Sequence, residues 1–453
     1  MIFPRFSQNL ILWGVWILII GIGSVFCWER VLYQDSAYAL FKVLNLQNTV
    51  EHGRFIVPFI LWLGYLASFL SLPISFVVWG ISMGNIIWGL LLTIYFYKRT
   101  QNSLWSWGPA IIILGTGPDF FFLGISEMIT ALLLALVFSY FLILEKKISL
   151  IFLILAFFSH PGILPAIALL FILLIIQHTK SSLLWANMAT FVSIVTLKVF
   201  VFKNSEYEQG IIEHIGETNQ VGFFNSWGFE YFVSSLKNWL LPFILLITTS
   251  LAIGKTSLKK IGQILVLVVA TLFIVYVYRK GDSYLMMQKS FAPMIIMGFW
   301  ILILQNSASM TKKWPFAIIV FICLLGVFYR ASEGEFYRNR MKKLDKAIQL
   351  AGPGKFLTLS ESFSPEDYRV NWAIPYETFV RSAYKNGSNR TTTFSFIDSA
   401  ELKSINANPG VHKISKGQFK GANFAYPMSH TKLRKQYFEL DSFGWYEVYT
   451  RKQ

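Results

Sequence analysis

Residues 73–97 read PISFVVWGISMGNIIWGLLLTIYFY, with no charged side chain, and the basic pair Lys98-Arg99 follows at once. A run of about 20 apolar residues is long enough to cross the hydrocarbon core of a bilayer as a helix. The whole chain is 55% hydrophobic and contains 42 Phe, and similar runs recur through most of its length. The sequence therefore predicts an all-α polytopic membrane protein.

Eleven apolar segments are predicted to span the membrane. They are residues 9–27, 73–97, 104–123, 126–144, 148–159, 161–178, 183–203, 238–254, 260–278, 290–306 and 313–330. His160-Pro161-Gly162 separates the fifth from the sixth, because a proline inside a helix removes a backbone donor and breaks it. A further apolar stretch, 55–71, is expected to lie along the interface or to re-enter the membrane without crossing it.

The distribution of charge supports this topology and gives the orientation. With a cytoplasmic N-terminus, one side receives short basic loops in which Glu145 is the single acid, and their basic residues are Lys98, Arg99, Lys146, Lys147, Lys180, Lys255, Lys259, Lys260, Lys312 and Lys313. Short basic loops mark the cytoplasmic side of a membrane protein. We therefore expect a cytoplasmic N-terminus and an extracytoplasmic (periplasmic) C-terminus in an inner or plasma membrane. The net charge of +16 then reflects loops near anionic lipid and not a nucleic-acid partner.

Residues 331–453 lack an apolar run long enough to span, and they are predicted to form a soluble extracytoplasmic α/β domain beside a transmembrane domain of residues 1–330. This length is sufficient for a separate core. The expected elements are a helix over Tyr337–Leu350, a strand over Lys355–Leu359, a helix over Pro375–Tyr384, a strand over 391–397 and a last strand near Gly444–Thr450. The two cysteines, Cys27 and Cys323, both fall in apolar spans, so no disulfide framework is expected.

The loop after the first span carries two acids in a chain that is only 14% charged. It reads WERVLYQDSAY over residues 28–38 and contains Glu29 and Asp35. Ionisable groups at the edge of a membrane cavity are expensive to keep and usually serve a function. Asp35 has an alternative interpretation as the N-terminal cap of a helix over residues 36–46.

Other candidates also have simpler interpretations. Glu127 opens an apolar helix, where a negative charge also favours the helix dipole. Asp119 follows a proline and suits a turn, and His160 suits a helix end. The pair Arg279-Lys280 is unusual because basic pairs should face the cytoplasm in this topology, so it is expected to bind an anion such as a lipid phosphate. Further candidates in the outward segments are Lys42, His52, Arg54, Tyr284 and Lys289.

The order of these features resembles the GT-C superfamily of membrane glycosyltransferases. It is most similar to the branch that contains protein O-mannosyltransferases and the aminoarabinose transferases that modify lipid A. In that family an outward loop after the first helix carries an Asp near its start, and Asp35 in Gln34-Asp35-Ser36 matches that position. Gly53-Arg54-Phe55-Ile56-Val57-Pro58 resembles the family's next motif, which leads into an interfacial apolar stretch, as 55–71 is expected to be.

The resemblance extends over roughly residues 9–300 and includes departures. Tyr95-Phe96-Tyr97-Lys98-Arg99 is similar to the end of the family's next helix. Glu127 stands where the family more often has Asp, and His160 replaces a Lys in Ser159-His160-Pro161-Gly162. The segment Tyr284–Pro293 resembles the loop that leads into a proline-containing helix. Because of Glu127 and His160, the resemblance does not fix the donor type or the residues that bind the donor phosphate.

The resemblance implies transfer of a sugar from a polyprenyl-phosphate donor to an extracytoplasmic lipid, glycan or protein. Asp35 and Glu127 are then the expected catalytic residues. Arg54, Arg279, Lys280, Tyr284 and Lys289 are expected at the donor phosphate, and Glu29, Lys42, His52, Asp119 and His160 are further cavity candidates. No metal or cofactor is required, although Glu29 and Asp35 together are able to hold a divalent cation.

Three other functions are alternatives to a glycosyltransferase. A secondary transporter would show repeated halves and polar groups at the midplane of broken helices. A polysaccharide polymerase or ligase would use Arg and His in a late outward loop, whereas residues 204–237 contain no Arg. A membrane scaffold would leave the outward acids unexplained.

Overall fold

The structure is a computed structural model. It describes residues 5–50, 54–100, 104–177, 181–200, 222–236, 240–252, 258–277, 284–305, 313–359, 373–397, 433–438 and 447–448. The protein is mostly helical in these residues, as predicted.

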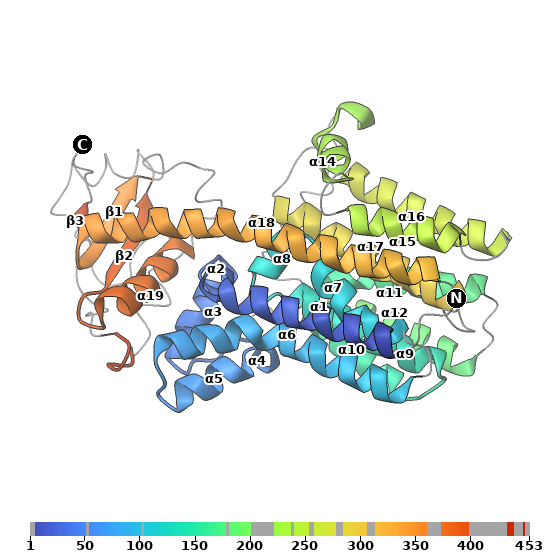
Figure 1. The fold of residues 1–453 in the computed structure, drawn as a ribbon, viewed down its shortest axis with the longest axis horizontal. Helices are drawn as coiled ribbons and strands as arrows, with labels where there is room; N and C mark the ends of the chain where they lie inside the picture. Colours follow the sequence, from blue (N-terminus) through green and yellow to red (C-terminus); the bar gives the residue numbers. More distant parts are fainter. Residues whose placement is uncertain are drawn as a thin grey trace.

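The helices form one elongated body (Figure 1). Those before residue 180 are α1 (Arg5–Val25), α2 (Cys27–Val31), α3 (Asp35–Leu44), α4 (Val57–Ile60), α5 (Trp62–Phe69), α6 (Ile74–Arg99), α7 (Leu104–Gly115), α8 (Pro118–Phe122), α9 (Glu127–Ile143), α10 (Ser149–Ser159), the 3-10 turn η1 (Pro161–Ile163) and α11 (Leu164–Ile176). Those that follow are α12 (Ser182–Phe200), the 3-10 turn η2 (Phe223–Asn225), α14 (Trp227–Leu236), α15 (Leu241–Ala252), α16 (Leu258–Val277), α17 (Tyr284–Gln305) and α18 (Lys313–Ala351).

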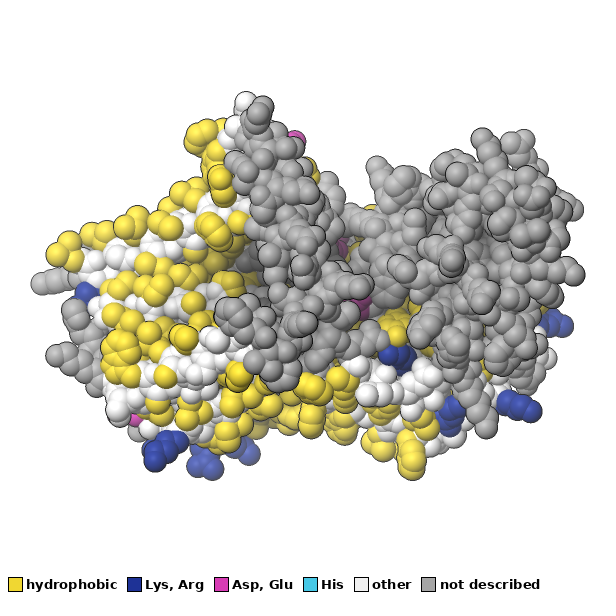
Figure 2. All heavy atoms as spheres, turned by 180° about the vertical axis from the view of Figure 1, so that it is seen from behind, with side chains coloured by type: hydrophobic (Ala, Val, Ile, Leu, Met, Phe, Trp, Pro, Cys, Tyr) yellow, Lys and Arg dark blue, Asp and Glu magenta, His cyan; other side chains and the backbone are white. Residues whose placement is uncertain are grey.

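The surface of this body is that of a membrane protein. Large apolar side chains such as Ile17, Phe76 and Phe273 are exposed, and Figure 2 shows hydrophobic side chains covering much of the visible described surface. Four described helices, α1, α6, α16 and α18, are long and apolar enough to cross a bilayer. A fifth span results only if α14 and α15, bent by 69° relative to each other, count as one broken span.

Each of the eleven predicted segments contains a helix, but several of these helices are short. The predicted break at His160 is confirmed: α10 ends at Ser159 and α11 begins at Leu164. The two helices have 11 and 13 residues, and at 1.5 Å per residue neither alone reaches the roughly 30 Å of a bilayer core. The count of eleven spans therefore stays a prediction.

The stretch 55–71 does not form one continuous helix. It divides into α4 and α5, which have four and eight residues. Both are too short to cross a bilayer alone. Helix α5 packs along α6, where Gly80 lies so close that an added Cβ would sit 2.9 Å from the Gly64 backbone nitrogen.

The first loop and the C-terminal part lie at the same end of the helical body. Asn9, near the start of α1, donates a hydrogen bond to Tyr97, near the end of α6, at 3.0 Å, so the two helices are antiparallel. Figure 1 shows the N-terminus at one end of the helical body, and α2, α3, α19 and the strands at the opposite end. The exposed basic pair Lys98-Arg99 ends α6 on the N-terminal side.

Helix α18 joins the apolar body to the C-terminal elements without interruption. Its 39 residues measure about 58 Å, roughly twice the bilayer core, so its polar second half extends beyond the membrane. The helix passes through position 330, where the composition predicts a domain boundary. It ends before Gly352, which adopts φ +73°, a conformation that favours glycine and stops the helix.

The C-terminal part has the predicted strands and helix. β1 (Gly354–Leu359), α19 (Ile374–Asn386), β2 (Thr392–Ile397) and β3 (Glu447–Val448) follow in chain order. The strands form a parallel sheet in the order β2-β1-β3, with Gly354 opposite Thr392. Most of the residues that surround β3 lie outside the described part, and an independently folded domain over 331–453 stays a prediction.

A single apolar cluster joins the first loop to α19. Phe41 of α3 contacts Tyr376 and Phe379 of α19, with ring centroids 5.3 and 6.1 Å apart. Phe438 stacks on Phe379 at 4.6 Å. The C-terminal part is therefore packed against the loop that carries the candidate acids.

Candidate functional site

A tight turn with an unusual backbone places Asp35. The backbone N–H of Ser36 donates to the carbonyl of Tyr33 at 3.1 Å. Between them Gln34 adopts φ 49° and ψ −129°, a turn conformation that glycine normally occupies. For a residue with a side chain it costs about 1–3 kcal/mol. Asp35 is the first residue of α3, and Gln34 is the cap, with no side-chain capping bond. The capping interpretation of Asp35 is therefore not supported.

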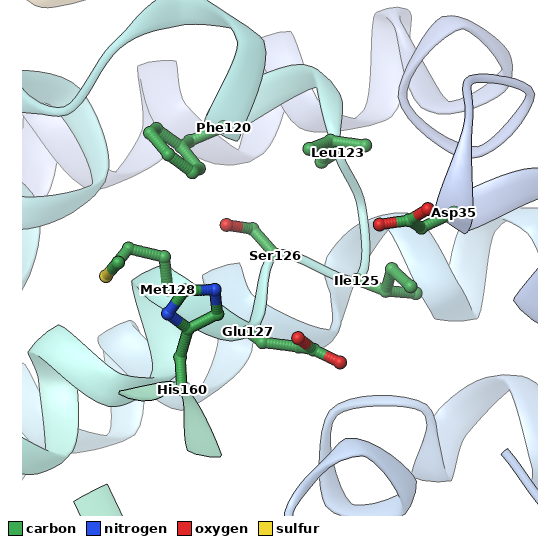
Figure 3. Close-up of a pocket in the computed structure, with 8 residues that line it drawn as sticks. All are labelled: Asp35, Phe120, Leu123, Ile125, Ser126, Glu127, Met128 and His160. Carbon is green, nitrogen blue, oxygen red and sulfur yellow. The ribbon is translucent and has the colours of Figure 1, made fainter. Parts of the chain in front are cut away.

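Three of the predicted residues line one small pocket. Its walls are Asp35, Phe120, Leu123, Ile125, Ser126, Glu127, Met128 and His160. Figure 3 shows Asp35 on one side of the segment that carries Ser126 and Glu127, and His160 on the other. The cavity of about 20 Å³ holds roughly one water molecule. The pocket is thus closed to a sugar in this conformation.

Arg54 lies beside this pocket as the partner of Glu127. The guanidinium of Arg54 and the carboxylate of Glu127 form an ion pair in which both side chains are mostly buried, at 14% and 16% exposure. Ser126 caps α9 by accepting a hydrogen bond from the N–H of Ile129 at 3.4 Å. Glu127 is therefore held at the helix start by its local structure and faces a cation from a distant segment.

His160 reaches the pocket through the break between α10 and α11. It ends α10 in an extended conformation, and its Nδ1 accepts a hydrogen bond from the N–H of Gly162 at 3.0 Å. The predicted role as a helix terminator and the place in the pocket are both present in this one residue.

The Asp35 carboxylate differs from those of Glu29, Asp119 and Glu127, which all have protein partners. Within the described part of the chain it has no hydrogen bond or ion pair, and it is half-buried. An acceptor oxygen without a protein partner at the wall of a pocket is suited to a proton or hydroxyl of a ligand.

Glu29, Lys42 and Asp119 do not line this pocket. Glu29 binds Arg338 at 3.2 Å, and Lys42 lies over the ring of Tyr38 at 4.5 Å. The buried Asp119 accepts hydrogen bonds from the hydroxyl of Tyr337 and, at 3.0 Å, from the amide of Gln288. Asp119 thereby joins α8 to α17 and α18.

The predicted late loop is described only in part. His52, Arg279 and Lys280 lie outside the described residues, and so do the side chains of Tyr284 and Lys289 in α17. The first turns of α17 are nevertheless placed by the bonds between Gln288 and Asp119. The helix also contacts η1, directly after His160.

A larger, open groove lies between α2, α18 and α19. It has a volume of about 640 Å³ and is lined by Val25, Trp28, Glu29, Arg338, Met341, Arg381, Tyr384 and Lys385. Its cations are paired: Arg338 with Glu29 and Glu335, and Arg381 and Lys385 with Asp345. Because Glu29 and Asp35 line different cavities, they do not form a common cation site here.

Sequence analysis missed Glu377 and Arg340. Glu377 of α19 is fully buried and binds Arg340 of α18 at 2.5 Å. Burial raises the pKa of the Glu377 carboxyl, although Arg340 and the N–H of Gln34 oppose this shift. Glu377 looks like an ordinary acid in the first turn of a helix, and no local pattern indicates its partners.

Among the described residues, no group of three or more His, Cys, Asp or Glu side chains is arranged to hold a metal ion. Comparison of the chain with protein-family models, with curated proteins and with solved structures gave no match.

Proposed function

We propose that this protein is an integral membrane glycosyltransferase that moves a sugar from a polyprenyl-phosphate donor to an extracytoplasmic lipid, glycan or protein. The proposal includes eleven spans, a cytoplasmic N-terminus and an extracytoplasmic C-terminus. The residues proposed to form the active site lie in the first loop, at the start of α9 and at the break after α10.

One observation carries the proposal. Asp35, Glu127 and His160, which are far apart in the sequence, line the same pocket. The sequence alone indicates each of them as a candidate, and it contains no pattern that links the three. Their convergence supports a shared chemical role more strongly than three separate structural roles.

Asp35 is proposed as the base. Its carboxylate accepts the proton of the acceptor hydroxyl as that oxygen attacks the anomeric carbon, and the bond to the donor phosphate breaks on the opposite side. An Asp or Glu at the edge of a water-poor cleft is a common base for such a step. Glu127 orients Arg54 from the neighbouring wall of the pocket.

The leaving phosphate requires cations. Arg54 is proposed to supply one, and the donor phosphate then competes with Glu127 for its guanidinium. Arg279, Lys280, Tyr284 and Lys289 remain proposed phosphate ligands. Because the pocket holds about one water molecule, donor binding must widen it, and separation of Arg54 from Glu127 is the proposed opening step.

The test is donor consumption by the full-length protein in cell-envelope membranes, which supply the acceptors. A panel of radiolabelled polyprenyl-phosphate hexoses and pentoses is the probe. We expect the wild type to consume at least one donor and Asp35→Asn to fall to background while it inserts and melts as the wild type does. Consumption by Asp35→Asn at the wild-type rate would remove Asp35 from the mechanism, and no consumption of any donor by the wild type would contradict the function.

A further inference from the structure

The C-terminal helix α19 makes a direct contact with the turn that precedes Asp35. The backbone N–H of Gln34 donates to the Oε1 atom of Glu377 at 3.1 Å. The other carboxylate oxygen of Glu377 accepts from Arg340 at 2.5 Å. Glu377 is 0% exposed, so this contact is shielded from water.

Arg340 contacts the same turn from a second direction. One of its nitrogens donates to the carbonyl of Leu32 at 3.4 Å, and its guanidinium lies 5.3 Å from the centre of the Tyr33 ring. Leu32, Tyr33 and Gln34 are therefore all held by the Glu377–Arg340 pair. Figure 1 shows α18 and α19 beside α2 and α3, where this contact is made.

The held turn is the strained one. Gln34 has φ 49°, and a residue with a side chain keeps such a conformation only where its surroundings impose it. A hydrogen bond from a backbone N–H to a buried carboxylate is charge-assisted and stronger than a neutral one. The Glu377 carboxylate thus restrains the Tyr33–Gln34 peptide group, one residue before Asp35, through a charge-assisted hydrogen bond.

We propose that Glu377 is a positioning residue, which fixes the Gln34 peptide and thereby keeps the Asp35 carboxylate directed into its pocket. The consequence for catalysis rests on the function proposed above, whereas the restraint of the turn does not. The soluble and membrane parts then act together, because α19 and α18 set the geometry of the first loop.

A merely structural interpretation is that Glu377 and Arg340 join α18 to α19. The chain contains a matched control for that interpretation. Asp345 and Arg381 join the same two helices through hydrogen bonds of 2.7 and 2.9 Å, and no contact of theirs reaches residues 32–34 in the described part. The first variant is therefore Arg340→Met/Glu377→Leu, and its control is Asp345→Leu/Arg381→Met.

Both charges are removed together because a single buried charge without its partner is strongly destabilising, whereas an apolar replacement of the pair is often tolerated. The first measurement is hydrogen exchange of the Gln34 amide in the full-length protein in lipid nanodiscs. We expect exchange to accelerate roughly tenfold or more in Arg340→Met/Glu377→Leu, the change that corresponds to loss of one charge-assisted hydrogen bond. We expect no acceleration in Asp345→Leu/Arg381→Met.

The second measurement is rescue by glycine. Gln34→Gly removes the steric penalty at this φ, so the turn no longer depends on Glu377. We expect Arg340→Met/Glu377→Leu to lower kcat for donor consumption without a matching change in KM, and the added Gln34→Gly to restore most of it. A purely structural role predicts no restoration.

Unchanged exchange of the Gln34 amide in Arg340→Met/Glu377→Leu would overturn the proposal. If that variant does not fold, Glu377→Gln replaces it: its amide oxygen still accepts, without charge, so a smaller acceleration is expected and none would contradict the proposal. The two proposals fail separately. Activity retained by Asp35→Asn would end the transferase proposal while the exchange result stands.

Discussion

Two acids of the same short loop lie in opposite environments. Glu29 faces an open groove of about 640 Å³ and binds Arg338. Asp35, six residues later, faces a small cavity of about 20 Å³ and has no partner among the described side chains. The sequence made both of them candidates, Asp35 as an expected catalytic residue and Glu29 as a further cavity residue. The structure separates them by the presence or absence of a counter-charge.

The charges of the groove are balanced within the protein. Arg338 is shared between Glu29 and Glu335, and Asp345 is shared between Arg381 and Lys385. Such networks hold helices together and leave little net charge for a ligand. The pocket at Asp35 has the opposite property, because no described cation is paired with the Asp35 carboxylate. This difference is the reason for proposing a structural role for the groove and a chemical role for the pocket.

The largest effect in this comparison, after loss of Asp35 itself, is expected for Glu127→Gln. The change leaves Arg54 without its carboxylate partner beside the pocket. Donor consumption should fall by about 10- to 100-fold, because a hydrogen bond to a charged group, here the one that orients Arg54, contributes roughly 1.5–3 kcal/mol. Initial rates with the radiolabelled donor measure it.

The control for Glu127→Gln is Glu145→Gln, which makes the same change just beyond the other end of α9, where the side chain is exposed. It should leave the rate unchanged. A rate for Glu127→Gln within twofold of the control would remove Glu127 from the site.

A smaller effect is expected for Glu29→Gln on the groove side. Arg338 keeps Glu335 as a partner at 2.7 Å and is itself partly exposed. Donor consumption should stay within a few-fold of the wild type, and the free energy of unfolding should fall by about 1–3 kcal/mol, because the buried Glu29 loses a charge-assisted hydrogen bond. Thermal denaturation in detergent measures the second quantity. A loss of activity as large as that of Asp35→Asn would invalidate the contrast between the two cavities.

The smallest effect concerns the pH dependence of the groove network. Burial alone would raise the pKa of the Asp345 carboxyl, but hydrogen bonds and charges of Arg381 and Lys385 outweigh it and lower the pKa below 3.8. A carboxyl with a lowered folded-state pKa stabilises the protein above its unfolded value and loses this contribution as the pH falls. The difference in melting temperature between wild type and Asp345→Asn should therefore be constant near neutral pH and shrink below about pH 4. A difference independent of pH would contradict this assignment.

Local chemistry predicted several elements correctly. The break at His160-Pro161-Gly162 follows from the missing N–H of proline, and α10 and α11 end and begin around it. Gly352, which lies between the long helix and β1, adopts a positive φ, and β1 begins within one residue of the predicted strand over Lys355–Leu359. β2 and α19 also lie where the pattern of apolar and polar residues placed them.

Helix lengths and distant pairs were not predictable in the same way. Hydropathy does not distinguish one span over 104–123 from α7 and α8, because both helices are apolar and Gly117-Pro118 only redirects the chain. The change of composition near position 330 suggested a boundary, yet α18 continues through it because its polar half packs on α19. The contact of Gln34 with Glu377 joins residues 343 positions apart, and no periodic pattern in the sequence predicts it.

Both cavities belong to the same end of the protein, and the account requires that end to face away from the cytoplasm. The most direct test places single cysteines in a Cys27→Ala/Cys323→Ala background. Lys385→Cys, exposed on α19, reports on the cavity end, and Lys147→Cys, exposed between α9 and α10, reports on the basic end. A membrane-impermeant maleimide should label Lys385→Cys in right-side-out vesicles and Lys147→Cys only in inside-out vesicles. The reverse pattern would place the Asp35 pocket out of reach of an extracytoplasmic acceptor and contradict the account, and labelling of both from one side would contradict the topology on which the account depends.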